Sequence, residues 1–241
     1  MNDKVFDRIE KKYLITKEQK QAFLPLIKRR IKKDSYFNSK VVSIYFDNDN
    51  YDLITQSIDW TDFKEKLRAR SYDGYDRVFI EIKTKIRYPD DNIGYKRRVM
   101  ITRSDFDKLI SHKKTLVELS QASVETENDI QIAREADYLI GYFNLKPKIA
   151  ISYDRKSYKD ESGLRITFDE NLKYRDKNLR FIKAKRDKIY FKDDQNIIME
   201  VKAQGVMPLW LVQKMSELKV YPQQFSKIGK IYERIIKEQN V

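Results

Sequence analysis

Charged and apolar side chains alternate along residues 78–86, VFIEIKTKI. If this segment is a β-strand, the β-branched residues Ile80 and Ile82 share one face, because successive side chains of a strand point to opposite faces. The other face carries Glu81 and Lys83. Such a face is either solvated surface, or it binds an anionic ligand through its ammonium groups.

Six further segments show the same alternation, with one apolar face and one face rich in Lys and Arg. A single strand of this kind is typical of any half-solvated sheet, but the recurrence predicts that the charged faces meet on one side of the sheet. If the sheet closes into a barrel, the enclosed cations need a polyanion, and oligophosphate suits Arg forks and Lys point charges. The residues on these faces are Arg8, Glu10 and Lys12; Lys64, Lys66, Arg68 and Arg70; Glu81, Lys83 and Lys85; Lys96 and Arg98; Tyr153 and Arg155; Arg165, Thr167 and Asp169; and Glu200 and Lys202.

Three carboxylates stand among these cations, namely Glu10, Glu81 and Glu200. Hard oxygen ligands suit Mg²⁺ or Mn²⁺, and such an ion would bridge phosphate oxygens and polarise a phosphoryl group during its transfer. The alternative is that each glutamate forms ion pairs with neighbouring Lys and Arg. The sequence leaves both interpretations open.

The composition restricts the class of protein. The 241 residues contain 50 Lys and Arg against 37 Asp and Glu, and the net charge of +13 indicates either a polyanionic partner or a Lys-rich solvated surface. The absence of cysteine excludes disulfides and thiol nucleophiles, and the single histidine, His112, is expected at the surface. The first residues lack the apolar core of a signal peptide, and no run of about 18 apolar residues occurs, so we expect a cytoplasmic location and no intrinsic membrane span.

Strand-like and helical segments alternate without a Gly/Ser- or Pro-rich linker, so we expect one domain over residues 1–241. The pattern predicts an α+β fold, an antiparallel β-barrel with helices packed on the outside. Thr16 and Gln19 predict a capping box, and Ser104 is a candidate cap for a later helix. The expected strands lie near residues 5–14, 40–47, 63–72, 77–87, 94–101, 147–155, 163–169, 179–183, 187–191 and 196–203, and the expected helices at 16–31, 105–119, 128–143, 208–219 and 225–239.

Taken in their order along the chain, the charged strand segments and the last helix resemble the VTC domain, the polyphosphate polymerase domain of the vacuolar transporter chaperone family. That domain belongs to the triphosphate tunnel metalloenzyme, or CYTH-like, superfamily. The resemblance runs from about Asp7 to Glu233 and rests on the ordered motifs RIEKKYL, KLRARSY, FIEIKTK, YKRR, SYDRKSY, LRITFDE, IIMEVKAQG and FSKIGKIYE. It implies a β-tunnel in which the γ-phosphoryl group of ATP, or of another nucleoside triphosphate, is transferred to inorganic polyphosphate.

The resemblance also implies roles for individual residues. A catalytic set contacts phosphate: Lys12, Arg68, Arg70, Lys83, Lys96, Arg155 and Arg165. Tyr153 is a hydrogen-bond donor to phosphate, Ser226 and Lys227 form a phosphate site at the tunnel end, and Lys202 is a further candidate for substrate binding. Glu200 is the implied ligand of Mn²⁺ or Mg²⁺, with Glu10 and Glu81 as additional candidates.

The chain departs from the family pattern at Lys85, where the eukaryotic pattern has histidine, and at Gln224, where lysine is expected. Arg8 also replaces the first carboxylate of the Glu-x-Glu-x-Lys triplet of CYTH enzymes, which favours polymerisation over hydrolysis by a tripolyphosphatase or nucleoside triphosphatase. A non-catalytic module that binds polyphosphate or nucleic acid is the third interpretation. We expect no nucleic acid partner, because most tyrosines fall within strand or helix patterns rather than at exposed stacking positions. The sequence indicates no particular protein partner.

Overall fold

The structure is a computed structural model that describes residues 8–59, 61–72, 76–88, 92–121, 126–182, 187–191 and 196–239. The strands in these ranges are β1 (Arg8–Ile15), β2 (Lys32–Asp47), β3 (Phe63–Tyr72), β4 (Val78–Arg87), β5 (Asn92–Ile101), β6 (Lys146–Lys159), β7 (Arg165–Arg175), β8 (Lys188–Ile189) and β9 (Ile197–Gln204). The helices are α1 (Lys17–Arg30), α2 (Asp52–Ile58), α3 (Arg103–Ile110), α4 (Leu116–Gln121), α5 (Glu127–Tyr142), α6 (Leu209–Glu217) and α7 (Lys227–Gln239). None of the helices in the described ranges has both the length and the apolar character needed to cross a bilayer.

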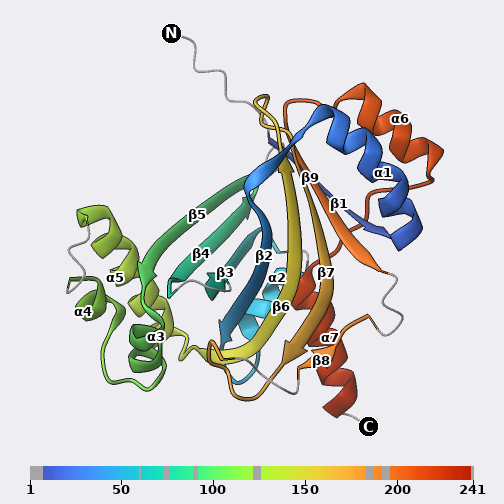
Figure 1. Ribbon diagram of the computed structural model, residues 1–241. Coiled ribbons are helices and arrows are strands. Elements are labelled where there is room, and N and C mark those ends of the chain that lie inside the picture. The colour runs from blue at the N-terminus through green and yellow to red at the C-terminus, as the bar shows by residue number, and fades with distance from the viewer. Residues whose placement is uncertain are drawn as a thin grey trace. The chain divides into compact units, whose positions relative to one another are not determined.

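Within the described ranges the strands form one nine-stranded sheet in the order β1-β9-β7-β6-β2-β3-β4-β5, and β8 pairs with β7 (Figure 1). The pairs of β9 with β1 and β7, of β2 with β3, and of β4 with β3 and β5 are antiparallel. The α+β class predicted from the sequence is confirmed.

The chain divides into two compact units, which are described separately. Unit 1 contains residues 1–40, 153–172 and 189–225, and unit 2 contains residues 41–152, 173–188 and 226–241. Strands β2, β6, β7 and β8 supply residues to both units. The expectation of one domain over the whole chain stays a prediction.

The core of unit 1 lies between one face of its strands and the helices α1 and α6, which lie side by side (Figure 1). Phe168 and Met199 project from β7 and β9 and are fully buried with Phe23 of α1 and Leu211 of α6. Because the buried residues of each strand alternate with polar ones, the face opposite the core carries charged side chains. The predicted packing of helices on the apolar face is therefore confirmed in this unit.

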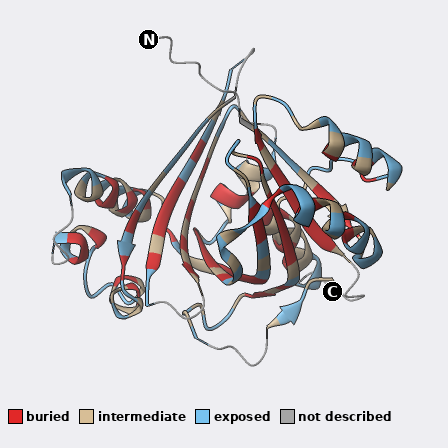
Figure 2. Cartoon of the chain, turned by 45° about the horizontal axis from the view of Figure 1, so that its top comes forward, coloured by how far each residue is buried: buried red, intermediate tan, exposed pale blue. Residues whose placement is uncertain are grey.

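The core of unit 2 forms in the same way. Leu67, Ile80 and Val99 project from β3, β4 and β5 and are buried with Phe106 of α3 and Ala136 of α5. Along β3 buried positions alternate with half-buried ones, and Figure 2 shows buried positions interrupted by half-buried and exposed ones along the strands of the sheet. The charged positions that include Arg68, Glu81 and Lys96 therefore lie on the face opposite the helices, whereas Arg97 of β5 lies on the core face, where its Nη2 is 2.8 Å from a carboxylate oxygen of Glu135 on α5.

Two helix predictions need correction. The capping box of Thr16 and Gln19 is present at the start of α1, but α3 is capped by Thr102, whose hydroxyl accepts from the amide of Asp105, and Ser104 lies inside the helix. The expected helix over 105–119 is divided into α3 and α4. His112, at a φ of 54°, donates from its amide to the carbonyl of Leu109, which ends α3 in a left-handed cap usually made by glycine or asparagine.

Some strand predictions are also wrong. Residues 179–182 are irregular, and residue 183 lies outside the described part. Arg175 donates to the carbonyls of Asn178 at 3.1 Å and Arg180 at 2.6 Å, so these backbone groups form hydrogen bonds without a strand partner. The strand expected at 187–191 is reduced to β8, and β2 begins eight residues earlier than the expected residue 40, at Lys32. The short helix α2 has no predicted counterpart.

Candidate functional site

Glu81 is the centre of the charged cluster in unit 2. Glu81 lies on β4 and is 2% exposed. In the strand register it stands directly between Arg68 of β3 and Arg98 of β5. One carboxylate oxygen, Oε2, is 2.6 Å from Nη2 of Arg68 and accepts from its Nε at 2.7 Å. The other, Oε1, is 2.5 Å from Nζ of Lys96. Glu81 therefore binds two cations from two different strands.

The guanidinium group of Arg68 is held on a second side by Tyr45 of β2. Nη1 of Arg68 donates to the tyrosine hydroxyl at 3.2 Å. Arg70, two positions further along β3, donates from its Nε to the hydroxyl of Ser43 at 3.1 Å. Both arginines are thus oriented by polar side chains that project from the same face of β2.

The electrostatics of this cluster favour a deprotonated carboxylate. Burial alone would raise the pKa of Glu81, but Arg68, Arg70 and Lys96 outweigh it and lower that pKa to about 2. Burial and the two arginines also lower the pKa of Lys96, against the opposite effect of Glu81. The cluster therefore contains more positive charge than one carboxylate neutralises.

A row of three lysines crosses the same face of unit 2. Lys83 on β4 is the direct register partner of Lys66 on β3 and of Lys96 on β5. Like charges placed directly opposite one another on neighbouring strands destabilise a sheet. An oligophosphate lying across the three strands would relieve this repulsion, which makes the row a candidate phosphate site.

The charged cluster of unit 1 is built around Lys202 of β9. Its Nζ lies 2.8 Å from Oε1 of Glu200 and 3.0 Å from Oε2 of Glu10 on β1. Lys12 is the register partner of Glu200 and donates from its Nζ to the carbonyl of Phe225 at 3.1 Å. The register places these residues on the face opposite the apolar core, as the alternation predicts.

In unit 1, Arg155 is held by two hydrogen bonds of its guanidinium group. Its Nε and Nη2 donate to the two carboxylate oxygens of buried Asp169 at 2.6 and 2.8 Å, and its guanidinium group lies 5.3 Å from the ring centre of Tyr153. Burial alone would lower the pKa of Arg155, but Tyr153, Asp169 and Glu200 raise it. The guanidinium group therefore stays charged at every accessible pH.

Arg165 of β7 has a different environment. Its Nε donates to the hydroxyl of Ser157 at 3.0 Å, and Nη2 lies 3.0 Å from a carboxylate oxygen of Asp34. Its side chain is 36% exposed, so it is both oriented and reachable from solvent.

Ser226 acts as the cap of α7. Its carbonyl accepts from the amide of Lys230 at 2.9 Å, and its hydroxyl accepts from the amide of Gly229 at 3.3 Å. Lys227 is the first residue of the helix, where backbone amides and the helix dipole favour an anion. The phosphate site proposed for this pair stays a prediction.

The structure distributes the predicted site residues between the two units. Unit 1 holds Glu10, Lys12, Tyr153, Arg155, Arg165, Glu200 and Lys202; unit 2 holds Arg68, Arg70, Glu81, Lys83, Lys96, Ser226 and Lys227. Within unit 1 the structure joins Glu10 and Glu200 through Lys202, and within unit 2 it joins Arg68 and Lys96 through Glu81. The roles assigned to all these residues stay predictions. The side chain of Arg8 lies outside the described part of the structure.

Sequence reasoning missed the polar residues that hold arginines, among them Tyr45 and Asp34. Tyr45 falls within an expected strand, but its contact with Arg68 depends on the register between β2 and β3, which the sequence does not show. Asp34 lies in the unexpected first part of β2, so its pairing with Arg165 had no sequence signal.

The carboxylates differ in how well they fit a metal ion. In the described residues no three His, Asp or Glu side chains gather into one ligand set. Glu10 and Glu200 nevertheless lie close enough to share one lysine nitrogen, and two carboxylates completed by phosphate oxygens are a usual way to bind Mg²⁺. Both oxygens of Glu81 are already engaged by cations, which supports the ion-pair interpretation of that residue.

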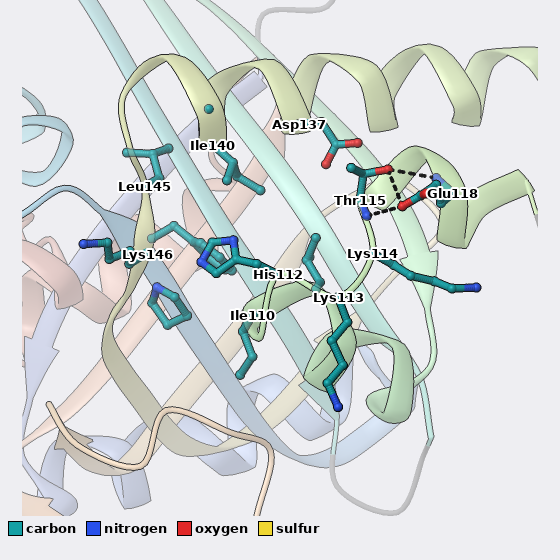
Figure 3. Close-up of a pocket in the computed structure, with 14 residues that line it drawn as sticks. Ile110, His112, Lys113, Lys114, Thr115, Glu118, Asp137, Ile140, Leu145 and Lys146 are labelled. Atoms are coloured by element: carbon teal, nitrogen blue, oxygen red, sulfur yellow. Dashed lines mark hydrogen bonds between the residues drawn. The ribbon is translucent and has the colours of Figure 1, made fainter.

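A separate pocket of about 400 Å³ lies in unit 2 among α3, α4 and α5 (Figure 3). Phe46 and Leu145 contribute apolar walls, and Figure 3 shows Lys113 and Lys114 extending in different directions. The carboxylate of Asp137 accepts from two amides at the start of α4, at 2.8 and 2.9 Å. None of the predicted site residues lines this pocket, so the two charged clusters, and not the pocket, define the candidate site.

Comparison with solved structures identifies the class of fold. The chain superposes on a Hippeastrum protein described as a putative adenylyl cyclase, HpAC1, with a dominant triphosphatase activity, at a TM-score of 0.55 and 14% identity over 92% of this chain and 93% of that one. The shared fold is that of the triphosphate tunnel proteins, as the sequence predicts. The PH1819 protein of Pyrococcus horikoshii aligns with a TM-score of 0.47 and 14% identity, over 94% of this chain and 99% of that one.

Sequence comparison gives the family. The VTC domain profile matches residues 7–234, and the chain belongs to the VTC domain family. A curated relative, vacuolar transporter chaperone complex subunit 4 of Schizosaccharomyces pombe, is 25% identical over 150 residues. That alignment covers 56% of this chain and only 20% of the relative's own length.

Proposed function

We propose that this chain is a metal-dependent polyphosphate polymerase, which transfers the γ-phosphoryl group of ATP or another nucleoside triphosphate to inorganic polyphosphate. Membership of the VTC domain family supports the reaction class. The observation that carries the proposal is the row of Lys66, Lys83 and Lys96 across three adjacent strands, next to Arg68. Such a row favours a ligand with one negative charge at each unit of an extended chain.

The cations have distinct tasks in this proposal. Arg68 and Arg70 are pre-oriented by hydrogen bonds, so they bind phosphate oxygens with little loss of side-chain entropy. Lys83 and Lys96 neutralise further phosphate groups in the same unit. In unit 1, Arg155, Arg165, Lys12 and Lys202 bind phosphate, Tyr153 donates a hydrogen bond to it, and Ser226 and Lys227 of unit 2 bind the chain at a helix start. Within each unit these groups would hold phosphates in place while charge redistributes in transfer.

Glu200 and Glu10 are the residues that we propose to hold Mn²⁺ or Mg²⁺. A bound divalent ion would supply charge neutralisation on the phosphoryl group being transferred. Lys202, which contacts both carboxylates, would have to move away from at least one of them to admit the ion. For Glu81 we favour the role of a fixed counter-charge that orients Arg68 and Lys96.

Hydrolysis is the second candidate reaction, because the Hippeastrum protein of the same fold is described as having a dominant triphosphatase activity. In that case water replaces the polyphosphate end as the acceptor. The arginine at position 8, in place of a carboxylate, supports polymerisation instead. A binding module without turnover is the remaining alternative.

Product analysis separates these candidates. The purified chain is incubated with ATP and Mn²⁺ or Mg²⁺, and the products are resolved by length on a gel. We expect a ladder of polyphosphate that is abolished by Arg68→Ala and strongly reduced by Glu200→Gln. The ladder should be retained by Lys156→Ala, which removes an exposed cation next to Arg155. Orthophosphate without polymer supports hydrolysis, and unchanged ATP with retained polyphosphate supports a binding module.

We also propose that residues 1–241 act as one domain and that the enzyme works in the cytoplasm. The family match supports the first point, because residues 7–234 include segments of both units. Limited proteolysis would test it, since one domain should resist cleavage between the units until the whole chain unfolds.

A further inference from the structure

Tyr45 is a buried phenol at the edge of the cation cluster of unit 2. It lies on β2, is 8% exposed, and is the direct register partner of Arg68. Nη1 of Arg68 donates to its hydroxyl at 3.2 Å, and the guanidinium carbon is 5.9 Å from the ring centre. The hydroxyl oxygen therefore accepts a hydrogen bond from a cation that the proposed function assigns to phosphate.

Three cations lower the pKa of this hydroxyl. They come from Arg68, Arg70 and Lys66 of β3, while Glu81 of β4 engages the far edge of Arg68 and Lys96 lies one strand beyond. Burial alone would raise the pKa of Tyr45, but the three cations outweigh burial and lower that pKa to about 8. Tyr45 can therefore ionise near neutral pH. The phenolate then adds a second negative charge to a cluster whose cations outnumber its single carboxylate.

We propose that Tyr45 is a phosphate-responsive positioning residue: its phenolic oxygen orients Arg68 in the ligand-free protein, and its phenolate form takes up a proton from solvent when a polyphosphate binds to the cations of β3. The proposal rests on the proposed phosphate-binding function and adds to it a residue that neither the sequence motifs nor the family resemblance single out. Two structural facts carry it, the direct contact of the hydroxyl with Arg68 and the burial of the phenol among three cations.

The physical reason is competition between two anions for the same cations. A bound oligophosphate neutralises Arg68, Arg70 and Lys66, so the phenolate loses the charges that stabilise it and is repelled by the new ligand. The neutral phenol is then the favoured form, and its proton comes from solvent. By linkage, the same uptake means that deprotonation of Tyr45 at higher pH weakens phosphate binding.

Calorimetric titration with sodium tripolyphosphate, in the absence of metal, measures this proton. The titration is repeated in two phosphate-free buffers of different ionisation enthalpy, which gives the number of protons taken up per ligand bound. At a pH of about 8 half of the Tyr45 side chains are ionised, so we expect the wild type to take up about 0.5 proton more than Tyr45→Phe. At a pH of about 7 the expected difference falls to about 0.1 proton.

The control is Tyr36→Phe, which removes the hydroxyl of a tyrosine that is 65% exposed and lies outside the cluster. It should behave as the wild type does. If tripolyphosphate binds to all three proteins with equal proton uptake, the inference about Tyr45 is wrong while the phosphate-binding function stands. If the wild type does not bind tripolyphosphate, the proposed function fails and this inference fails with it. The near-ultraviolet absorbance of phenolate provides a second readout. It should fall when tripolyphosphate binds to the wild type and should not change in Tyr45→Phe, in agreement with the calorimetry.

Discussion

Glu81 and Arg68 face each other directly across β4 and β3, and a carboxylate oxygen of Glu81 lies 2.6 Å from Nη2 of Arg68. The carboxylate is almost completely buried, and its second oxygen contacts Lys96. A buried charge of this kind is stable only while its partners are present. The pair therefore links the stability of unit 2 to the orientation of the cations that we propose to bind phosphate.

Replacing Glu81 by glutamine should destabilise the protein. Glu81→Gln keeps the shape of the side chain but leaves Arg68 and Lys96 without their counter-charge, so the free energy of unfolding should fall by about 2–4 kcal/mol. Urea unfolding measures the change. Glu161→Gln, at a side chain that is 98% exposed, is the matched control and should change the value by less than about 0.5 kcal/mol. Equal effects of the two variants would contradict the role given to Glu81.

The contribution of Glu81 should also depend on pH in a defined direction. Its pKa is lowered from 4.5 to about 2 in the folded protein, so its stabilising effect is complete above the unfolded value and is lost as the pH falls from about 4.5 toward 2. The shift corresponds to a contribution of the order of 3 kcal/mol. The difference in unfolding free energy between the wild type and Glu81→Gln should therefore be larger at about pH 6 than at about pH 3. A difference that grows on acidification would contradict the assignment.

Much of this cluster was predictable, because alternation alone placed Glu81, Lys83 and the arginines of residues 63–72 on charged strand faces. What the sequence lacked was the register, since the contact between Glu81 and Lys96 joins different strands and depends on which residues stand opposite. Tyr45 was overlooked for the same reason, because its hydroxyl gains significance only next to Arg68. The division into α3 and α4 was missed because His112 occupies a left-handed position for which glycine is the usual signal.

Substitution by valine should have opposite effects on stability at two buried threonines. The hydroxyl of Thr167 on β7 is buried without a hydrogen-bond partner among the described residues, whereas that of Thr84 on β4 donates to Glu65 and accepts from Arg97, both at 2.9 Å. Thr167→Val should raise the unfolding free energy by about 0.5–1 kcal/mol, because it removes an unsatisfied polar group. Thr84→Val should lower it by about 1–2 kcal/mol. Thermal unfolding without phosphate tests both, and destabilisation by Thr167→Val would show that its hydroxyl has a partner in solution.

Glu200→Gln should separate metal binding from phosphate binding. Loss of the carboxylate should reduce metal-dependent activity about 100-fold, because the proposed ion loses a ligand. Metal-free affinity for tripolyphosphate should be unchanged or higher, since a negative charge next to Lys202 is removed. Calorimetry and rate measurements over a range of Mn²⁺ concentrations give the two quantities. If Glu200→Gln lowers both equally, the residue orients phosphate-binding cations and is not a metal ligand.

The fate of a labelled γ-phosphoryl group tests the central claim most directly. ATP labelled at that group is mixed with Mn²⁺, the protein and a polyphosphate of single defined length, and the products are separated by length during the first turnovers. We expect the label in chains one unit longer than the primer, with release of ADP. This transfer should disappear in Arg68→Ala and persist in Lys156→Ala. Label found only in orthophosphate, at any chain concentration, would contradict the account and identify the protein as a hydrolase.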